Sequence, residues 1–144
     1  MNLTLDANIW VGAFDPGDSR QPIYKKVLKD IFLSPDITVF SPYLMEVEVL
    51  ASMTRKFRGT REIKNLKHLM RSHPRHHWFV LDYKFAQEAA RCATTLFLRG
   101  ADAVYVATAL SNNSTLVTFD REIIDRASSA VDVIKPDQWL EMRA

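Results

Sequence analysis

Residues 3–10 read LTLDANIW, and this stretch decides the fold because it joins a buried strand to a helix through a carboxylate. The apolar segment Leu3–Asp6 predicts a short buried strand. Asn8 can cap a helix, which we predict over Asn8–Phe14. Asp6 therefore marks the carboxyl end of a strand at the point where the chain turns into a helix.

Strands and helices alternate along the rest of the chain. Further strands are predicted over Ile37–Phe40, Trp78–Leu81, Thr115–Phe119 and Val131–Ile134. Helices are predicted over Pro22–Leu33, Tyr43–Phe57, Thr60–Ser72, a long segment through Leu98 that Gly100 ends, Ala101–Leu110 and Arg121–Ser128. This alternation gives βαβ units and a mainly parallel sheet covered on both faces. We predict a three-layer α/β/α fold in a single domain over residues 1–144.

The composition is that of an ordinary globular protein. The chain has 144 residues, of which 47% are hydrophobic and 25% charged, and its formal net charge is +2. A general polyanion binder would be far more basic. Cys92 is the only cysteine, which excludes an intrachain disulfide. No apolar run approaches the roughly 20 residues that span a bilayer, so we expect a cytoplasmic protein without a membrane partner.

Four acidic residues fall where this topology can bring them together: Asp6, Glu46, Asp102 and Asp120. Asp6 and Asp120 follow predicted strands, and ligands of open parallel sheets bind beyond the carboxyl ends of the strands. Two ionised carboxylates about 4 Å apart repel by about 1 kcal/mol in water and about 4 kcal/mol near a protein surface. A bound divalent cation relieves such repulsion and supports phosphoryl chemistry.

Each of these carboxylates also has a simpler structural explanation. Asp6 and Asp120 can act as helix caps, an interaction that contributes about 0.5–2 kcal/mol. Asp102 precedes AVYVATAL, which is small or apolar nearly all round and indicates a buried helix. A carboxylate there must be paired, hydrogen-bonded or bound to a metal. The residues alone leave capping and function open at these positions.

The acidic position on the helix after the second strand has two candidates, Glu46 and Glu48. Residues two apart on a helix point to different faces. Glu46 shares its stripe with Leu50 and Met53, whereas Glu48 shares one with Arg55. We therefore expect Glu46 to face inward and Glu48 to face solvent.

The order of the motifs LDANIW, SPYLMEV, RGADAVYVATA and LVTFDR resembles that of PIN-domain nucleases, and the chain is most similar to VapC-type toxins of VapBC toxin–antitoxin systems. The resemblance covers nearly the whole chain. It implies a catalytic, metal-binding quartet of Asp6, Glu46, Asp102 and Asp120. Asn8 and Thr118 are implied as supporting polar groups.

The same resemblance implies an activity and its partners. The activity is Mg²⁺- or Mn²⁺-dependent cleavage of RNA phosphodiester bonds by an endoribonuclease. The implied partners are an RNA substrate, a cognate antitoxin protein and a second copy of the chain in a homodimer. A PIN nuclease that serves routine RNA processing is the alternative within the same class.

Basic residues and all four histidines gather between residues 55 and 77. Because basic side chains bind phosphates and release counterions, we predict that this segment contacts the RNA backbone. The predicted contacts are Arg55, Lys56, Arg58 and Arg61. A solvated helix face is the alternative explanation of the same charge run.

Two further classes of protein share parts of this pattern. A phospho-accepting receiver domain also has a parallel sheet, an acidic pocket and a Lys-Pro pair, which Lys135-Pro136 supplies. However, a receiver needs adjacent acids after its first strand, and Asp6 is followed by Ala7. A domain that binds RNA or protein without catalysis is the second class, and the intact acidic quartet argues against it.

Overall fold

The computed structural model describes the backbone of residues 1–144 and every side chain except that of Thr60. Its strands are β1 (Asn2–Leu5), β2 (Thr38–Pro42), β3 (His76–Phe79), β4 (Thr115–Val117) and β5 (Val133–Ile134). Its helices are α1 (Ala7–Phe14), α2 (Gln21–Leu33), α3 (Tyr43–Phe57), α4 (Thr60–Met70), α5 (Tyr83–Leu96), α6 (Gly100–Ser111), α7 (Arg121–Ala127) and α8 (Pro136–Arg143).

The five strands form one parallel sheet in the order β3-β2-β1-β4-β5, with β1 at its centre. The register pairs Leu5 of β1 with Val117 of β4. Asp6 and Thr118, the residues that follow these two, therefore leave the sheet side by side. The prediction of a parallel sheet is confirmed, and this pairing brings together two strand ends that lie more than a hundred residues apart in the chain.

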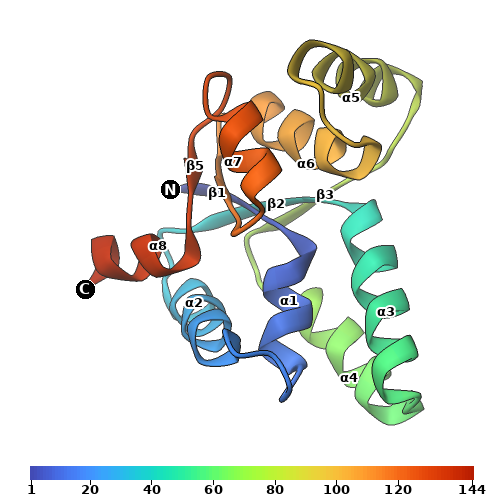
Figure 1. Cartoon of the computed structure of the whole chain (residues 1–144). Coiled ribbons are helices and arrows are strands. Elements are labelled where there is room, and N and C mark those ends of the chain that lie inside the picture. The colour runs from blue at the N-terminus through green and yellow to red at the C-terminus, as the bar shows by residue number, and fades with distance from the viewer.

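Helices cover both faces of the sheet, which confirms the three-layer α/β/α arrangement. Figure 1 shows α1 to α4 on one side of the sheet and α5 to α7 on the other. The sheet contributes apolar side chains to the core, and Leu3, Leu5 and Leu116 are completely buried in it. Burying side chains of this size stabilises a fold by about 1.5–3 kcal/mol each.

Helix α6 is largely buried, as its small and apolar sequence predicts. Every residue from Ala103 to Ala109 is buried, including the hydroxyl-bearing Thr108. Thr108 Oγ1 donates a hydrogen bond of 2.8 Å to the carbonyl oxygen of Val104, so the hydroxyl is satisfied within the helix. The helix packs on the sheet with one side and on α5 with the other.

The third strand lies two residues earlier than predicted. β3 comprises His76–Phe79, whereas Val80 and Leu81 lie beyond it and are 65% and 51% exposed. The prediction followed the apolar run, but His76 can occupy an edge strand because both ring nitrogens are satisfied. They lie 3.1 Å from the carbonyl oxygen of Met70 and 2.8 Å from the hydroxyl of Ser41.

Helix α5 ends earlier than predicted, and Gly100 has a different role. The helix stops at Leu96 because Phe97 takes a left-handed backbone conformation with φ of 56°. Gly100 does not end α5 but is the first residue of α6. Strands β4 and β5 are also shorter than the predicted segments Thr115–Phe119 and Val131–Ile134.

Helix α8 was not predicted from the sequence. Its anchor is Trp139, which is completely buried and donates through Nε1 to Asp30 Oδ2 at 3.0 Å. Arg143 Nε donates to the same oxygen at 3.2 Å. These contacts to α2 hold a segment whose own sequence is short and polar. Among the described residues, every helix is too short or too polar to cross a membrane.

A test of the fold concerns His76. Burial lowers its pKa from 6.5 to about 4. The unfolded chain therefore binds a proton between these pH values that the folded chain does not, and stability is lost as the pH falls through this window. The compared quantity is the unfolding free energy of the wild type minus that of His76→Gln. We expect this difference to fall by about 2–3 kcal/mol when the pH is lowered from about 7.5 to about 4.5.

Urea denaturation at both pH values measures this difference. His77→Gln is the matched control, because His77 is an exposed neighbour on the same strand. If the difference between wild type and His76→Gln is the same at both pH values, His76 does not carry this pH dependence.

Candidate functional site

The carboxyl ends of β1 and β4 meet at the hydroxyl group of Thr118. Thr118 is completely buried, and its Oγ1 donates to Asp6 Oδ2 at 2.7 Å. Thr118 Oγ1 also accepts a hydrogen bond of 2.9 Å from the backbone N–H of Asp120. The backbone N–H of Asp6 also donates to the carbonyl oxygen of Val117 at 3.2 Å. One threonine thus fixes the positions of two acidic residues from distant parts of the chain.

Asp6 and Asp120 both cap helices, as the simpler explanation predicts. Asp6 Oδ1 accepts from the backbone N–H of Asn8 at 3.2 Å, at the start of α1. Asp120 Oδ1 accepts from two backbone N–H groups of α7, at 2.8 and 3.2 Å. In each case the cap uses one carboxylate oxygen and leaves the second available for another contact. Capping and a role in a site are therefore compatible at both positions.

Asp102 lies in the first turn of α6 and joins this group through Arg99. Arg99 Nε donates to Asp102 Oδ2 at 2.9 Å, and its terminal nitrogen donates to Asp120 Oδ2 at 3.0 Å. Arg99 Nε also lies 3.2 Å from Glu122 Oε2. Asp102 is only 13% exposed, whereas Arg99 is 65% exposed. A surface arginine thus holds three carboxylates together from the solvent side.

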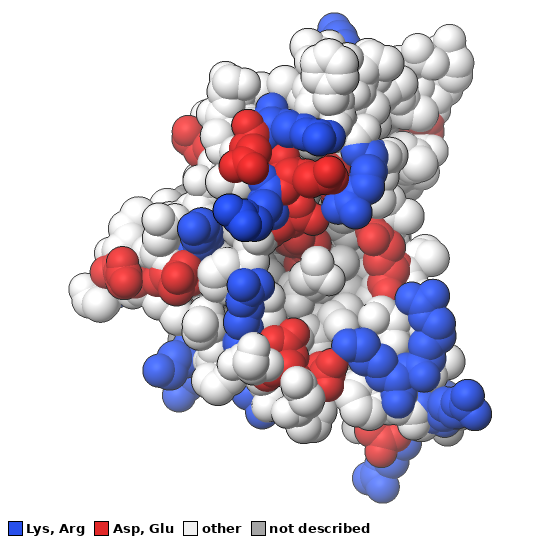
Figure 2. Space-filling model, in the orientation of Figure 1, with Lys and Arg blue, Asp and Glu red and all other residues white. Residues whose placement is uncertain are grey.

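The charges of this group act on one another. Burial, together with the nearby charges of Asp120 and Asp102, raises the pKa of Asp6 to about 6, against the lowering effect of the hydrogen bonds from Thr118 and Asn8. Burial also raises the pKa of Asp102, while its contact with Arg99 lowers it. Figure 2 shows acidic side chains gathered near the middle of one face, with basic side chains around them. The structure therefore brings three of the four predicted acids into one electrostatic cluster.

Glu46, the fourth predicted acid, lies elsewhere. Its carboxylate accepts two hydrogen bonds from Arg71, at 2.7 and 2.9 Å, and Lys67 lies 4.0 Å away. The hydrogen bond from Arg71 lowers the pKa of Glu46. The expectation that Glu46 faces the site does not match this arrangement, because its side of α3 faces the basic end of α4.

Glu48, which was expected to face solvent, instead lies on the side of α3 that faces α6. Its Oε1 accepts a hydrogen bond of 2.8 Å from the hydroxyl of Tyr105, a buried residue of α6. Burial raises the pKa of Glu48, and the charge of Asp102 raises it further. The sequence held one signal for this position, since Glu48 lies one helical turn after the apolar Met45.

The predicted RNA contacts lie at the end of α3 and the start of α4, where all four are exposed: Arg55, Lys56, Arg58 and Arg61. Figure 2 shows basic side chains gathered over this end of the molecule. Lys56 Nζ lies 2.6 Å from Asp15 Oδ2. Lys56 also lines a polar cavity that includes Asn8 and Asp120. Of the four, Lys56 thus has a direct structural link to the acidic cluster.

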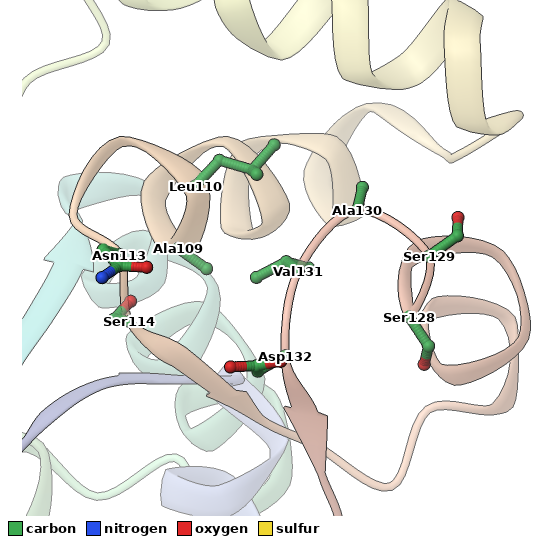
Figure 3. A pocket seen from close by; sticks show the side chains of 9 residues that line it. All are labelled: Ala109, Leu110, Asn113, Ser114, Ser128, Ser129, Ala130, Val131 and Asp132. Carbon is green, nitrogen blue, oxygen red and sulfur yellow. The ribbon is translucent and has the colours of Figure 1, made fainter.

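A separate hollow of about 230 Å³ lies at the opposite edge of the sheet, where β4 and β5 begin. Figure 3 shows its lining, which comes from the end of α6 and from the loop between α7 and β5. It contains none of the predicted site residues. Its Ser114 hydroxyl is already paired with the hydroxyl of Thr4 at 2.7 Å.

The acidic cluster offers oxygen ligands of the kind that Mg²⁺ and Mn²⁺ prefer. The residues that could hold such an ion are Asp6, Glu48, Asp102 and Asp120. Among the described residues, no three acidic, histidine or cysteine side chains already converge as a metal-binding group. Two of the carboxylates are turned toward the guanidinium of Arg99. A buried Asp6 beside two like charges nevertheless fits a cation, because a cation there offsets their repulsion.

The chain belongs to the PIN domain family, because the model of that family matches residues 3–129. No curated protein matches the chain. VapBC2 of Rickettsia felis, solved with a promoter DNA fragment, is 16% identical with a TM-score of 0.70, and the match covers 94% of this chain and 98% of the other.

Two more solved structures share the fold. VapC20 of Mycobacterium tuberculosis, described as a toxin that cleaves the sarcin–ricin loop, is 15% identical with a TM-score of 0.70, over 90% of this chain and 95% of the other. VapBC-1 of nontypeable Haemophilus influenzae is 17% identical with a TM-score of 0.68, and the match covers 95% of this chain and 99% of the other. At these identities the similarity establishes the fold.

The role of Arg99 as the counter-ion of the cluster can be tested with Arg99→Gln. Without the guanidinium, Asp102, Asp120 and Glu122 repel one another, so we expect a lower melting temperature at low ionic strength. We also expect Mn²⁺ to raise the melting temperature of this variant more than that of the wild type, because the ion no longer competes with Arg99. Thermal denaturation over a Mn²⁺ titration measures both effects.

Arg91→Gln is the control, since Arg91 is an exposed arginine that pairs with Glu88 on α5. Equal Mn²⁺ responses in Arg99→Gln and wild type would contradict the assignment of Arg99 as the competing cation.

Proposed function

We propose that this PIN-domain protein is a Mg²⁺- or Mn²⁺-dependent endoribonuclease and the toxin of a toxin–antitoxin pair. The observation that carries the proposal is the electrostatic cluster that Asp6 and Asp120, at the ends of β1 and β4, form with Asp102 of α6, with the charge of Asp102 also acting on Glu48. Membership of the PIN domain family supports it. The description of the similar M. tuberculosis protein as a toxin that cleaves the sarcin–ricin loop supports RNA as the substrate.

In this mechanism Asp6, Asp102 and Asp120 would hold the metal. Thr118 and the N–H of Asn8 keep the Asp6 carboxylate fixed, so little reorganisation is needed when the ion binds. A bound Mg²⁺ or Mn²⁺ supplies Lewis-acid stabilisation of the phosphodiester and lowers the pKa of water.

Glu48 is assigned the role that the sequence suggested for Glu46, which is to orient the attacking water or hold a second ion. Its Oε1 is fixed by Tyr105, which leaves Oε2 to accept a proton. Burial raises the pKa of Glu48 and makes it a better base than an exposed glutamate. In the same proposal, Arg55, Lys56, Arg58 and Arg61 contact the RNA backbone.

An apolar groove supports an antitoxin as partner. The groove has a volume of about 410 Å³ and lies between the end of α1 and the helices α3 and α4. Its lining is mostly apolar and includes Phe14, Met53, Phe57, Ile63 and Leu66. We propose that an apolar segment of the antitoxin occupies it, and that the toxin is a homodimer. Similar structures include a toxin–antitoxin complex from Klebsiella pneumoniae.

A PIN nuclease for routine RNA processing is the second candidate, and it uses the same chemistry. The two are separated by expression in a host with and without the neighbouring open reading frame. A toxin arrests growth when expressed alone and is relieved by its antitoxin, whereas a processing nuclease shows neither effect. The receiver domain is excluded by membership of the PIN domain family.

Substitution of single acids tests the assignment of the site. We expect Asp6→Asn and Asp102→Asn to abolish cleavage, because each removes a proposed metal ligand. We expect Glu48→Gln to slow cleavage by about 10²–10⁴-fold, the contribution typical of a general base. Glu46→Gln, a matched change two residues away, retains cleavage within a few-fold of wild type. Single-turnover cleavage of RNA with Mn²⁺ measures all four.

The melting temperature of each variant separates lost chemistry from lost folding. If Glu46→Gln is inactive while Glu48→Gln cleaves normally, the site contains Glu46 and our placement of Glu48 is wrong. Full activity of a well-purified Asp6→Asn and Asp102→Asn would refute the nuclease site itself.

A further inference from the structure

A polar cavity opens directly beside the acidic cluster. Its volume is about 330 Å³, and its lining comes from α1, the loop before α2, α2 itself, α3 and the residues before α7. Asn8 and Asp120 belong both to this cavity and to the acidic cluster. Ligand pockets range from about 300 to 1,000 Å³, so this cavity suits one small unit of a ligand.

One wall of the cavity carries a cation that is held in place by an aromatic ring. The guanidinium carbon of Arg20 lies 4.4 Å from the centre of the Phe119 ring. This stacking fixes the plane of the guanidinium while its N–H groups remain able to donate. Among the described residues, no carboxylate forms an ion pair with Arg20 within 4.0 Å. Its positive charge is therefore available to a ligand.

A second cation comes from α3. Lys56 lines the cavity, is 43% exposed and pairs with Asp15. The hydroxyl groups of Ser52 and Tyr24 line the same space. Burial raises the pKa of Tyr24, so this hydroxyl stays protonated and can donate. The lining thus combines two cations and two neutral hydroxyl groups with the carboxylates of Asp18 and Asp120. Asp18 Oδ1 accepts a hydrogen bond of 2.8 Å from the backbone N–H of Arg20, and Asp120 belongs to the acidic cluster.

Gly12 keeps this space open. A Cβ atom at position 12 would lie 2.2 Å from Cε2 of Tyr24 and 3.1 Å from Oδ2 of Asp18. Because glycine has no side chain, the Tyr24 ring packs directly against the backbone of α1 instead of projecting into the cavity. The cavity is thus maintained by the local sequence of α1 and α2.

The arrangement of charge identifies the ligand. The carboxylates that would hold a metal lie at one end, and Arg20 and Lys56 line the adjoining cavity. A nucleic-acid strand has phosphates at each step, so one phosphate can lie over the metal site while the next contacts the cations.

We infer that this cavity is the subsite for the nucleotide next to the scissile phosphate of single-stranded RNA, with Arg20 and Lys56 as its phosphate contacts. The inference rests on the proposed ribonuclease function and deepens it, because it locates a part of the substrate that the acidic cluster does not contact.

The test compares the double variant Arg20→Gln/Lys56→Gln with a charge-matched double variant, Lys84→Gln/Arg91→Gln. Lys84 and Arg91 are exposed cations of α5, a helix that contributes nothing to the lining of this cavity. All chains carry Asp102→Asn and are studied in EDTA, so that RNA is bound without cleavage. The probe is a short, fluorescein-labelled, single-stranded RNA of mixed sequence, and its polarisation gives Kd at several NaCl concentrations.

We expect the cavity variant to bind roughly 10-fold more weakly than its parent. The slope of log K against log salt should fall by about 0.7 for each phosphate contact that is lost. The control pair, which loses the same net charge, should keep the slope of the parent. Arg20→Lys keeps the charge and should restore most of the slope. A structural role of Arg20 would change the melting temperature and leave the slope unchanged.

Cleavage by chains with intact Asp102 separates this inference from the proposed function. We expect the cavity variant to raise KM with little change in kcat, as a lost binding contact does. If the wild type cleaves RNA but the cavity variant keeps the parent's salt slope and KM, the subsite is refuted and the nuclease stands. If the wild type does not cleave RNA while the slope still falls, the proposed function is refuted and the RNA contact stands.

Discussion

The hydroxyl group of Thr118 is the contact on which the candidate site depends. It donates to Asp6 and accepts from the backbone N–H of Asp120. One hydroxyl group therefore positions two acidic residues that are 114 positions apart in the sequence. This contact is possible because β1 and β4 are parallel neighbours whose register ends together. The order of strands in the sheet is thus the cause of the acidic cluster.

The cluster creates a conflict of charge that the fold resolves in two ways. Helix caps and Thr118 satisfy some of the carboxylate oxygens from within, and Arg99 supplies a positive charge from the surface. The pKa values of Asp6 and Asp102 are still raised, because burial and the neighbouring negative charges disfavour the ionised carboxylates. The same repulsion between carboxylates favours the binding of a divalent cation. It also explains the position of the exposed Arg99, whose positive charge offsets this repulsion.

Much of this arrangement could be predicted from the sequence because it follows from local patterns. Alternating strands and helices predicted the layers, and strand ends and a buried helix predicted the positions of Asp6, Asp102 and Asp120. The choice between Glu46 and Glu48 could not be made this way. That choice depends on which element packs against each side of α3. Only the structure shows that Arg71, at the end of α4, donates two hydrogen bonds to Glu46. Helix α8 likewise depends on a distant contact, between Trp139 and Asp30.

The central claim is that folding builds one divalent-cation site from the ends of β1 and β4, α3 and α6. An anomalous difference map from a crystal soaked in Mn²⁺ tests it most directly. The account predicts a peak about 2.0–2.5 Å from carboxylate oxygens of Asp6 and Asp102, with Glu48 on the same side. A peak bound by Glu46 instead, or a fully soaked crystal with no peak beside Asp6, would contradict it.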